Sequence, residues 1–235
     1  MKEIKVGMVS LGCPKNQCDA EIMMDKIHKA GFKLVEEAGL ADVVVINTCG
    51  FIQSAKEEAI EEIMEAINRK ADGINKKIIV TGCLAQRYPE QMDEEFPEID
   101  GVIGLGHNGD IVKAINKVLA DKRVIMNSPL GEYNLEGSRL LSTMPHYAYL
   151  RIADGCDNRC SYCAIPYIRG GFRSRPMENI LEEVKSLASR GVKELVVIAQ
   201  DTTRYGLDIY GELKLPELLD RICETDGIKW IRLLY

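Results

Sequence analysis

Three cysteines lie close together in the second half of the chain, at Cys156, Cys160 and Cys163. Their spacing, C-x3-C-x2-C, puts three thiolates on one loop, where each can hold a different iron of a 4Fe–4S cluster. The fourth iron would stay open to a cofactor, much as an open position marks a catalytic zinc site. The alternative is a structural zinc loop, which needs four closed ligands. The nearest histidine, His146, belongs to the preceding expected strand, so the spacing favours the cluster.

Three further cysteines, Cys13, Cys49 and Cys83, each close a short apolar run that reads as a β-strand. The carboxyl ends of parallel strands share one edge of a sheet, so these thiols would converge there. A glycine adjoins each cysteine and permits tight turns or close approach of a bulky group; these are Gly12, Gly50 and Gly82. The alternative is three buried structural thiols, because free cysteine is commonly buried. Three equivalent strand ends favour a second cluster.

The remaining two of the eight cysteines, Cys18 and Cys223, lie among apolar residues of expected helices and predict core positions. Eight cysteines indicate metal binding or chemistry in a reducing compartment rather than structural disulfides. No apolar run is long enough to span a membrane. We therefore expect a cytoplasmic protein. The net charge of −6 argues against a generic nucleic-acid binder.

Alternating strand and helix patterns surround Cys13, Cys49 and Cys83. Strands are expected at residues 4–9, 42–47, 77–81 and 101–105. Helices are expected at 16–30 and 110–120, and another is expected to start at a capping box of Ser54 and Glu57. The run at 43–46 is apolar at every position, as in strands buried on both faces. This alternation predicts an α/β domain with a parallel sheet over residues 1–126.

The pattern lapses over residues 127–145, which we interpret as an interdomain linker. A new β/α series follows, with strands at 146–152, 194–199 and from about 228, and helices at 176–190 and 216–224. Three strands cannot close a barrel, so the domain at 146–235 is expected to be incomplete.

Cys156, Cys160, Tyr162 and Cys163 form C-x3-C-x-aromatic-C after the first strand of a β/α domain, which resembles the radical S-adenosylmethionine superfamily. The resemblance implies a partial β/α barrel whose open iron binds the amino and carboxylate groups of S-adenosylmethionine. One electron then splits this cofactor into methionine and a 5′-deoxyadenosyl radical. Tyr162 would pack near the adenine.

A three-cysteine domain ahead of such a domain resembles the methylthiotransferase family over essentially the whole chain. The resemblance implies two 4Fe–4S clusters, S-adenosylmethionine, an external electron donor and a sulfur source. One branch of the family modifies an adenosine in transfer RNA, and another modifies an aspartate side chain of the twelfth small-subunit ribosomal protein. Three segments are similar to the ribosomal branch, namely residues 11–16, 163–170 and 200–206. A non-catalytic iron–sulfur fragment remains a further alternative.

Arginines follow the cysteine loop, and polar residues end the next strand. Arg169, Arg173 and Arg175 could pair with a carboxylate of cofactor or substrate, or they could be solvated charges. Gln200 and Asp201 fall on the catalytic edge of a β/α barrel, where they are candidate cofactor contacts unless they cap a turn. Relatives are expected to continue beyond the last strand, so we expect this chain to bind clusters but turn over poorly.

Overall fold

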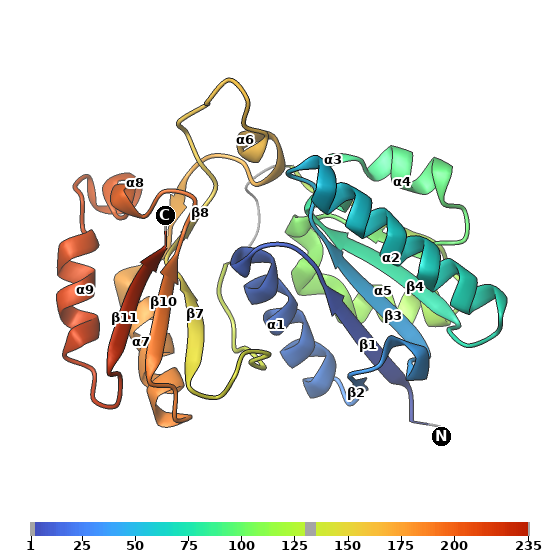
Figure 1. Cartoon of the computed structure of the whole chain (residues 1–235), viewed down its shortest axis with the longest axis horizontal. Coiled ribbons are helices and arrows are strands. Elements are labelled where there is room, and N and C mark those ends of the chain that lie inside the picture. Colours follow the sequence, from blue (N-terminus) through green and yellow to red (C-terminus); the bar gives the residue numbers. More distant parts are fainter. Residues whose placement is uncertain (1–2, 130–134, 235) are drawn as a thin grey trace. The chain divides into compact units, whose positions relative to one another are not determined.

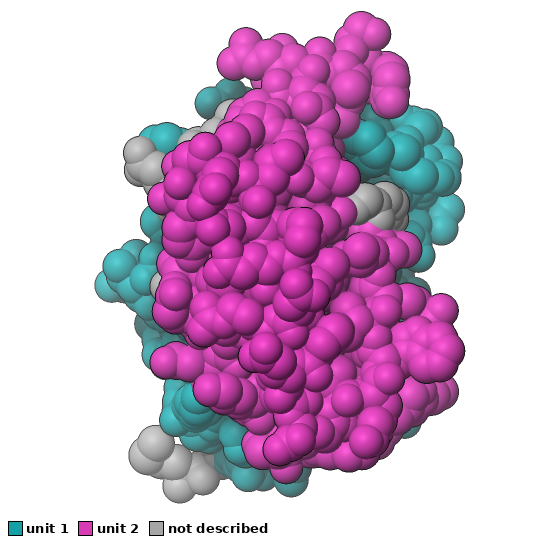
Figure 2. Space-filling model, turned by 90° about the vertical axis from the view of Figure 1, so that its left-hand side faces the viewer, with its two compact units in different colours: residues 1–134 teal, residues 135–235 magenta. Residues whose placement is uncertain are grey.

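The computed structural model describes residues 3–129 and 135–234 of the chain. These residues fall into two compact units, divided between residues 134 and 135 and coloured separately in Figure 2. The division lies inside the segment 127–145 that the sequence pattern marks as irregular. Within the described residues, no helix combines the length and apolar character needed to cross a membrane.

The N-terminal unit contains a parallel sheet with the strand order β2-β1-β3-β4-β5-β6. Its strands are β1 (Lys5–Ser10), β2 (Lys33–Val35), β3 (Val43–Thr48), β4 (Lys77–Gly82), β5 (Gly101–Ile103) and β6 (Val124–Met126). Every residue of β3 is buried, as the consecutive apolar run predicts for a central parallel strand. The order reverses between β1 and β3, so the ends of these strands form the topological switch point.

Two apolar cores cover the two faces of this sheet, beneath the helices of this unit that are labelled in Figure 1. On one face pack α1 (Pro14–Lys29) and α5 (Ile111–Leu119). On the other pack α2 (Gln53–Ala71), α3 (Cys83–Arg87) and α4 (Pro89–Glu95). Two short 3-10 helices, η1 (Ala38–Leu40) and η2 (Leu105–Asp110), complete the described elements of the unit. The helices bury the apolar faces that a doubly wound sheet presents on both sides.

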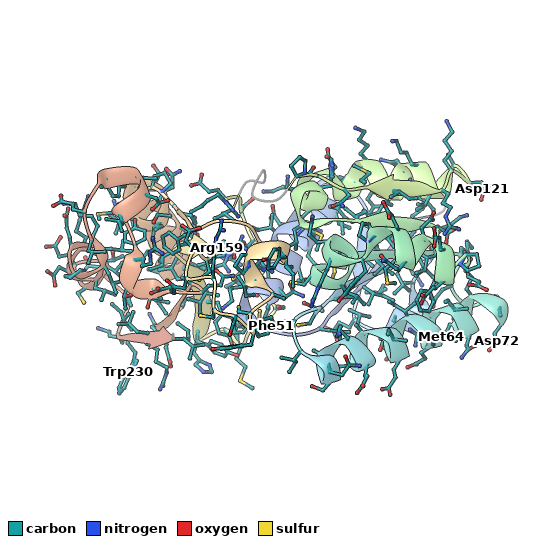
Figure 3. All side chains as sticks on the ribbon, turned by 90° about the horizontal axis from the view of Figure 1, so that it is seen from above. Phe51, Met64, Asp72, Asp121, Arg159 and Trp230 are labelled. Atoms are coloured by element: carbon teal, nitrogen blue, oxygen red, sulfur yellow. The ribbon has the colours of Figure 1, made fainter. Side chains whose placement is uncertain are left out.

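The C-terminal unit contains a parallel sheet of β7 (Tyr147–Arg151), β10 (Glu194–Ile198) and β11 (Trp230–Leu234), with β10 in the centre. The helices α7 (Met177–Ser189) and α9 (Leu215–Cys223) follow β7 and β10 along the chain and pack on one core with them. The β-α-β-α-β order begins a β/α barrel, as predicted. Trp230, labelled in Figure 3, stands exposed on the edge strand β11.

Shorter elements of this unit frame its loops. The strands β8 (Ala153–Asp154) and β9 (Arg173–Ser174) form an antiparallel pair. One-turn helices occur at α6 (Ile165–Ile168), η3 (Thr202–Arg204) and α8 (Leu207–Tyr210). The sequence pattern did not predict these elements, nor β2, β6, α3 and α4, because each is too short to show a period.

Two sequence-based predictions about local structure are wrong. The capping box fails because α2 begins two residues earlier than expected: Ile52, not Ser54, is the N-cap, and Ser54 already lies in the first turn. Gln53 instead donates a hydrogen bond to Glu57. Cys223 is exposed rather than in the core, because the buried face of α9 carries Leu218 and Ile222. Cys18 is buried, as predicted.

Candidate functional site

Cys13, Cys49 and Cys83 lie at the carboxyl-terminal edge of three neighbouring strands. Cys13 is the N-cap of α1 after β1, Cys49 follows β3, and Cys83 is the first residue of α3 after β4. The β3–β4 register pairs Thr48 with Gly82, so the two residues that follow them are the two cysteines. Cys13 and Cys49 flank the switch point, the usual ligand site of such sheets.

Glycines allow the three cysteine segments to touch. A Cβ atom placed on Gly12 would lie 2.7 Å from Cβ of Cys49, and one on Gly50 would lie 2.9 Å from the carbonyl carbon of Cys83. Gly82 has a φ of +93°, and a Cβ there would lie 2.4 Å from the carbonyl oxygen of Thr48. The structure therefore confirms the prediction that these glycines permit close approach of neighbouring segments.

The thiols at this edge are largely shielded from solvent. Cys49 and Cys83 are buried, at 8% and 5% exposure, and Cys13 is half-buried and makes no side-chain capping hydrogen bond. Asn47 Oδ1 is also buried here, and within the described part of the chain it accepts no hydrogen bond. Leaving a buried acceptor without a donor costs free energy. A bound group that donates a hydrogen bond to Asn47 Oδ1 would remove this cost.

The second cysteine group occupies one long loop of the C-terminal unit. The antiparallel ladder pairs Asp154 with Arg173 and closes the base of this loop. The Cys156 backbone NH donates to the Gly170 carbonyl at 3.1 Å. Gly155 has a φ of +77°, and a Cβ on it would lie 2.0 Å from the Gly171 carbonyl oxygen. Only glycine fits there, so the backbone on both sides of the loop base is in direct contact.

A buried acidic residue organises the base of the loop. Asp154 is fully buried and accepts hydrogen bonds from Arg169 Nη1 at 2.8 Å and from Gln200 Nε2 at 2.6 Å. Arg169 is itself only 1% exposed. Gln200 Oε1 is buried and accepts no hydrogen bond among the described residues. The sequence analysis missed Asp154; the available signal was an acidic residue directly after an apolar strand and before Gly155-Cys156.

The cysteines of the loop are more accessible than those at the sheet edge. Cys160 is exposed, while Cys156 and Cys163 are half-buried. Tyr162 is 86% exposed, so in this structure it is not a packed loop residue. Arg159, labelled in Figure 3, has a left-handed backbone with a φ of 48°. The loop thus presents its thiols and one aromatic ring to solvent.

Asp201 serves a turn next to the loop. Its carboxylate accepts hydrogen bonds from the Thr203 backbone NH and side-chain hydroxyl and from Asn158 of the loop. Burial raises the pKa of Asp201, but these hydrogen bonds outweigh burial and leave the pKa below its ordinary value. Asp201 therefore caps η3 and ties it to the loop.

The three arginines after the loop have different environments. Arg169 forms the buried ion pair with Asp154, and Arg175 forms one with Glu183 at 2.6 Å. Both are buried, so the reading of these two as solvated charges is wrong. Arg173 is partly exposed and donates through Nη1 to the carbonyls of Arg169 and Gly171.

The donor sets suit a cluster better than a single ion. Among residues 3–129 and 135–234, no three His, Cys, Asp or Glu side chains lie close enough to hold one metal ion. Ligands of a cluster each bind a different iron and therefore stand farther apart than ligands of one ion. Three thiols on a short loop, and three at one sheet edge, fit clusters bound by thiolates.

Comparisons with known proteins divide the chain in the same way. Residues 5–104 match a family described as "Uncharacterized protein family UPF0004", and residues 150–233 match the radical SAM superfamily. A "Ribosomal protein uS12 methylthiotransferase RimO" of Desulforamulus reducens is 51% identical over 98% of this chain and 52% of its own length. The protein of the same name from Clostridium tetani is 51% identical over 100% of this chain and 53% of its own length. The chain spans about half the length of the curated relatives it matches.

Solved structures show the same fold at low sequence identity. The cobalamin-dependent S-adenosylmethionine radical enzyme OxsB aligns with a TM-score of 0.60 at 14% identity, over 97% of this chain and 38% of OxsB. The radical S-adenosylmethionine methyltransferase TsrM of Kitasatospora setae aligns with a TM-score of 0.61 at 13% identity, over 97% of this chain and 54% of TsrM. The family matches and these likenesses together confirm the predicted fold class, a parallel-sheet domain followed by the first strands of a radical SAM barrel.

Proposed function

We propose that this chain, which belongs to the radical S-adenosylmethionine methylthiotransferase family, forms the two-cluster part of an enzyme that methylthiolates an aspartate side chain of ribosomal protein uS12. One observation carries the proposal: each unit gathers three cysteines at a place suited to a cluster, one at a sheet edge and one on a loop. The relatives that match the whole chain at about half identity bear the name of that activity.

The loop cysteines Cys156, Cys160 and Cys163 would hold the cluster that binds S-adenosylmethionine. When bound, this cluster would supply the electron that cleaves a carbon–sulfur bond of the cofactor. The paired base holds the loop in place. The exposed Cys160 and the half-buried Cys156 and Cys163 leave the outer side of the loop accessible to a cofactor. The role proposed for the residues of the loop is to hold the cluster and to orient S-adenosylmethionine on it.

Three residues around the loop are proposed contacts of S-adenosylmethionine, and a fourth, Asp201, is proposed to support them. Tyr162 offers an exposed ring on which adenine can stack. Gln200 Oε1 is a buried acceptor that suits the amino group. Arg173 would pair with the carboxylate. Asp201 would act by holding its turn and Asn158 in place rather than as a mobile ligand.

The sheet-edge cysteines Cys13, Cys49 and Cys83 would hold the second cluster, which handles the sulfur to be transferred. Burial of this edge supports that role, because a shielded site protects a reactive sulfur from water and oxidants. An external electron donor and a sulfur source are part of the proposal, as is a cytoplasmic location. The domain limits 1–126 and 146–235, with a linker between them, are proposed on the same basis.

The first test counts iron. The chain would be reconstituted without oxygen, and iron and sulfide would be measured for the parent and for two triple alanine variants, one for each cysteine group. Two clusters predict about eight irons in the parent and about four in each variant. Cys18→Ala and Cys223→Ala, which change cysteines outside both groups, should keep about eight.

The second test identifies the substrate. The reconstituted protein would be assayed in parallel with ribosomal protein uS12 and with transfer RNA, followed by mass spectrometry of both. A methylthio group on an aspartate of uS12 supports the proposal, and modified adenosine alone would assign the enzyme to the transfer-RNA branch. Two intact clusters without cleavage of S-adenosylmethionine after strong reduction would instead indicate a non-catalytic protein.

A further inference from the structure

Asn16 is a fully buried polar side chain in the first turn of α1, three residues after Cys13. A buried amide must find hydrogen-bond partners, because leaving it without them costs free energy. Asn16 finds them in the segments that carry the cysteines.

The amide of Asn16 touches all three strand ends. Its Nδ2 donates to the Leu11 carbonyl at 3.0 Å, just before Gly12-Cys13, and to the Thr48 carbonyl at 2.8 Å, just before Cys49. Its Oδ1 accepts a hydrogen bond from Cys83 Sγ at 3.5 Å. The two amide hydrogens serve two carbonyls, so the orientation of the group is fixed and the oxygen faces Cys83.

The hydrogen bonds of Asn16 lie beyond the ends of the strand pairings. The β1–β3 pairing ends at Ser10 and Asn47, and the β3–β4 pairing ends at Thr48 and Gly82. The cysteines lie beyond those residues, on turns that the ladder does not align. One backbone bond continues past the β1–β3 ladder, from the Leu11 NH to the Asn47 carbonyl at 2.9 Å. Asn16 adds a side-chain cross-link that reaches all three cysteine segments.

We propose that Asn16 is a positioning residue for the sheet-edge cluster: it sets the spacing of Cys13, Cys49 and Cys83 without being a ligand. The inference rests on the proposed second cluster. Asn16 holds the carbonyls of Leu11 and Thr48 on one amide, so the three thiols converge only while that amide donates in both directions. A side chain of the same shape without the donor breaks both bonds.

The test substitutes Asn16→Asp in the chain whose loop cysteines are changed to alanine, so that only the sheet-edge site binds iron. Asn75→Asp is the matched control. Asn75 is equally buried in the same unit, and its Nδ2 also donates to two carbonyls, those of Ala38 and Ala41 at 2.7 and 2.9 Å. It lies just before β4, at the opposite end of that strand from Cys83.

We expect the control to keep about four irons and the spectrum of its parent, and Asn16→Asp to lose most of that iron or to give an altered electron paramagnetic resonance spectrum. Thermal unfolding of the iron-free proteins shows whether both variants fold. If Asn16→Asp does not fold, Asn16→Ala, which removes the amide without adding charge, decides the question by the same readouts.

A folded Asn16 variant with full iron and an unchanged spectrum would overturn the inference, as would equal iron loss in the Asn75 control. Failure of the proposed function looks different. In that case the parent of this series, which still has Cys13, Cys49 and Cys83, binds no iron at all.

Discussion

The two cysteine groups of this chain are held in place by different kinds of chemistry. At the sheet edge of the N-terminal unit, neutral amides and glycines bring buried thiols together on strands that the whole sheet aligns. On the loop of the C-terminal unit, buried ion pairs fix the base and leave the thiols accessible. Backbone alignment can position residues far apart in sequence, whereas a single loop needs strong local anchors.

The largest expected effect comes from breaking a buried charge pair under the loop. Arg169→Met leaves Asp154 charged and buried, which should destabilise the C-terminal unit by about 3–5 kcal/mol. Urea unfolding of the iron-free chain measures this loss. The control is Arg232→Met, which breaks an exposed pair with Glu194 and should cost about 0–1 kcal/mol. Equal losses in the two variants would contradict the role of the buried pair.

At the sheet edge, steric crowding rather than loss of a charge pair should destabilise the fold. Gly82→Ala places a Cβ against the Thr48 carbonyl at a φ of +93° and should cost about 2–4 kcal/mol from strain and overpacking. Gly31→Ala is the control, because Gly31 has a similar φ of +86° but nothing within 4 Å of the added Cβ. It should cost only about 1–2 kcal/mol. Denaturant unfolding of the N-terminal unit separates crowding from backbone strain, and indistinguishable costs would remove crowding as the reason for Gly82.

Acid should weaken the charged framework first. Burial raises the pKa of Glu183, but the charges of Arg139 and Arg175 outweigh it and hold the pKa below its ordinary value. A carboxyl with a lowered folded-state pKa stabilises the fold above its unfolded pKa, and that stabilisation is lost as the pH falls through the folded value. We therefore expect the C-terminal unit to lose stability as the pH falls below about 4.5, the ordinary pKa of a glutamate carboxyl.

Glu183→Gln tests this sign. The variant should be less stable at neutral pH and should lose part of the acid dependence, as measured by thermal unfolding across pH. An unchanged pH profile would mean that other carboxyl groups dominate.

The smallest effect on stability is expected at Tyr162. Its ring is exposed, so Tyr162→Ala should change the free energy of unfolding by less than about 0.5 kcal/mol. It should nevertheless weaken binding of S-adenosylmethionine to the reconstituted chain, measured by calorimetry. Tyr167→Ala, another exposed tyrosine close to the loop, is the control and should leave affinity unchanged. Equal affinities in both variants would remove Tyr162 from the cofactor contacts.

Sequence reasoning predicted the long elements and the convergence of the strand-end cysteines because both depend on simple periods. The buried run at 43–46 fixed a central strand, and the parallel alignment followed from the strand and helix alternation. The supports of each site were not predicted. Asn16 and Asp154 act through partners tens of residues away, and no local pattern encodes such a contact.

The errors have a similar origin. Cys223 sits next to buried Ile222, and one step along a helix turns a side chain from the core to solvent. Arg175 was interpreted as a possible loop charge because its acidic partner, Glu183, lies farther along the chain, on the following helix α7. Whether the six predicted ligands bind iron stays a prediction until iron is counted.

The difference in burial between the two cysteine groups also bears on when and how iron could reach each of them. In the folded chain Cys160 can meet a large iron-delivery protein directly, whereas Cys49 and Cys83, at 8% and 5% exposure, cannot. If both groups hold clusters, a preassembled cluster can be handed over only to the loop. The sheet edge must be filled by small diffusing species, or before its turns close during biogenesis. By the same reasoning, we expect a cluster on the loop to be oxidised by air before one at the sheet edge.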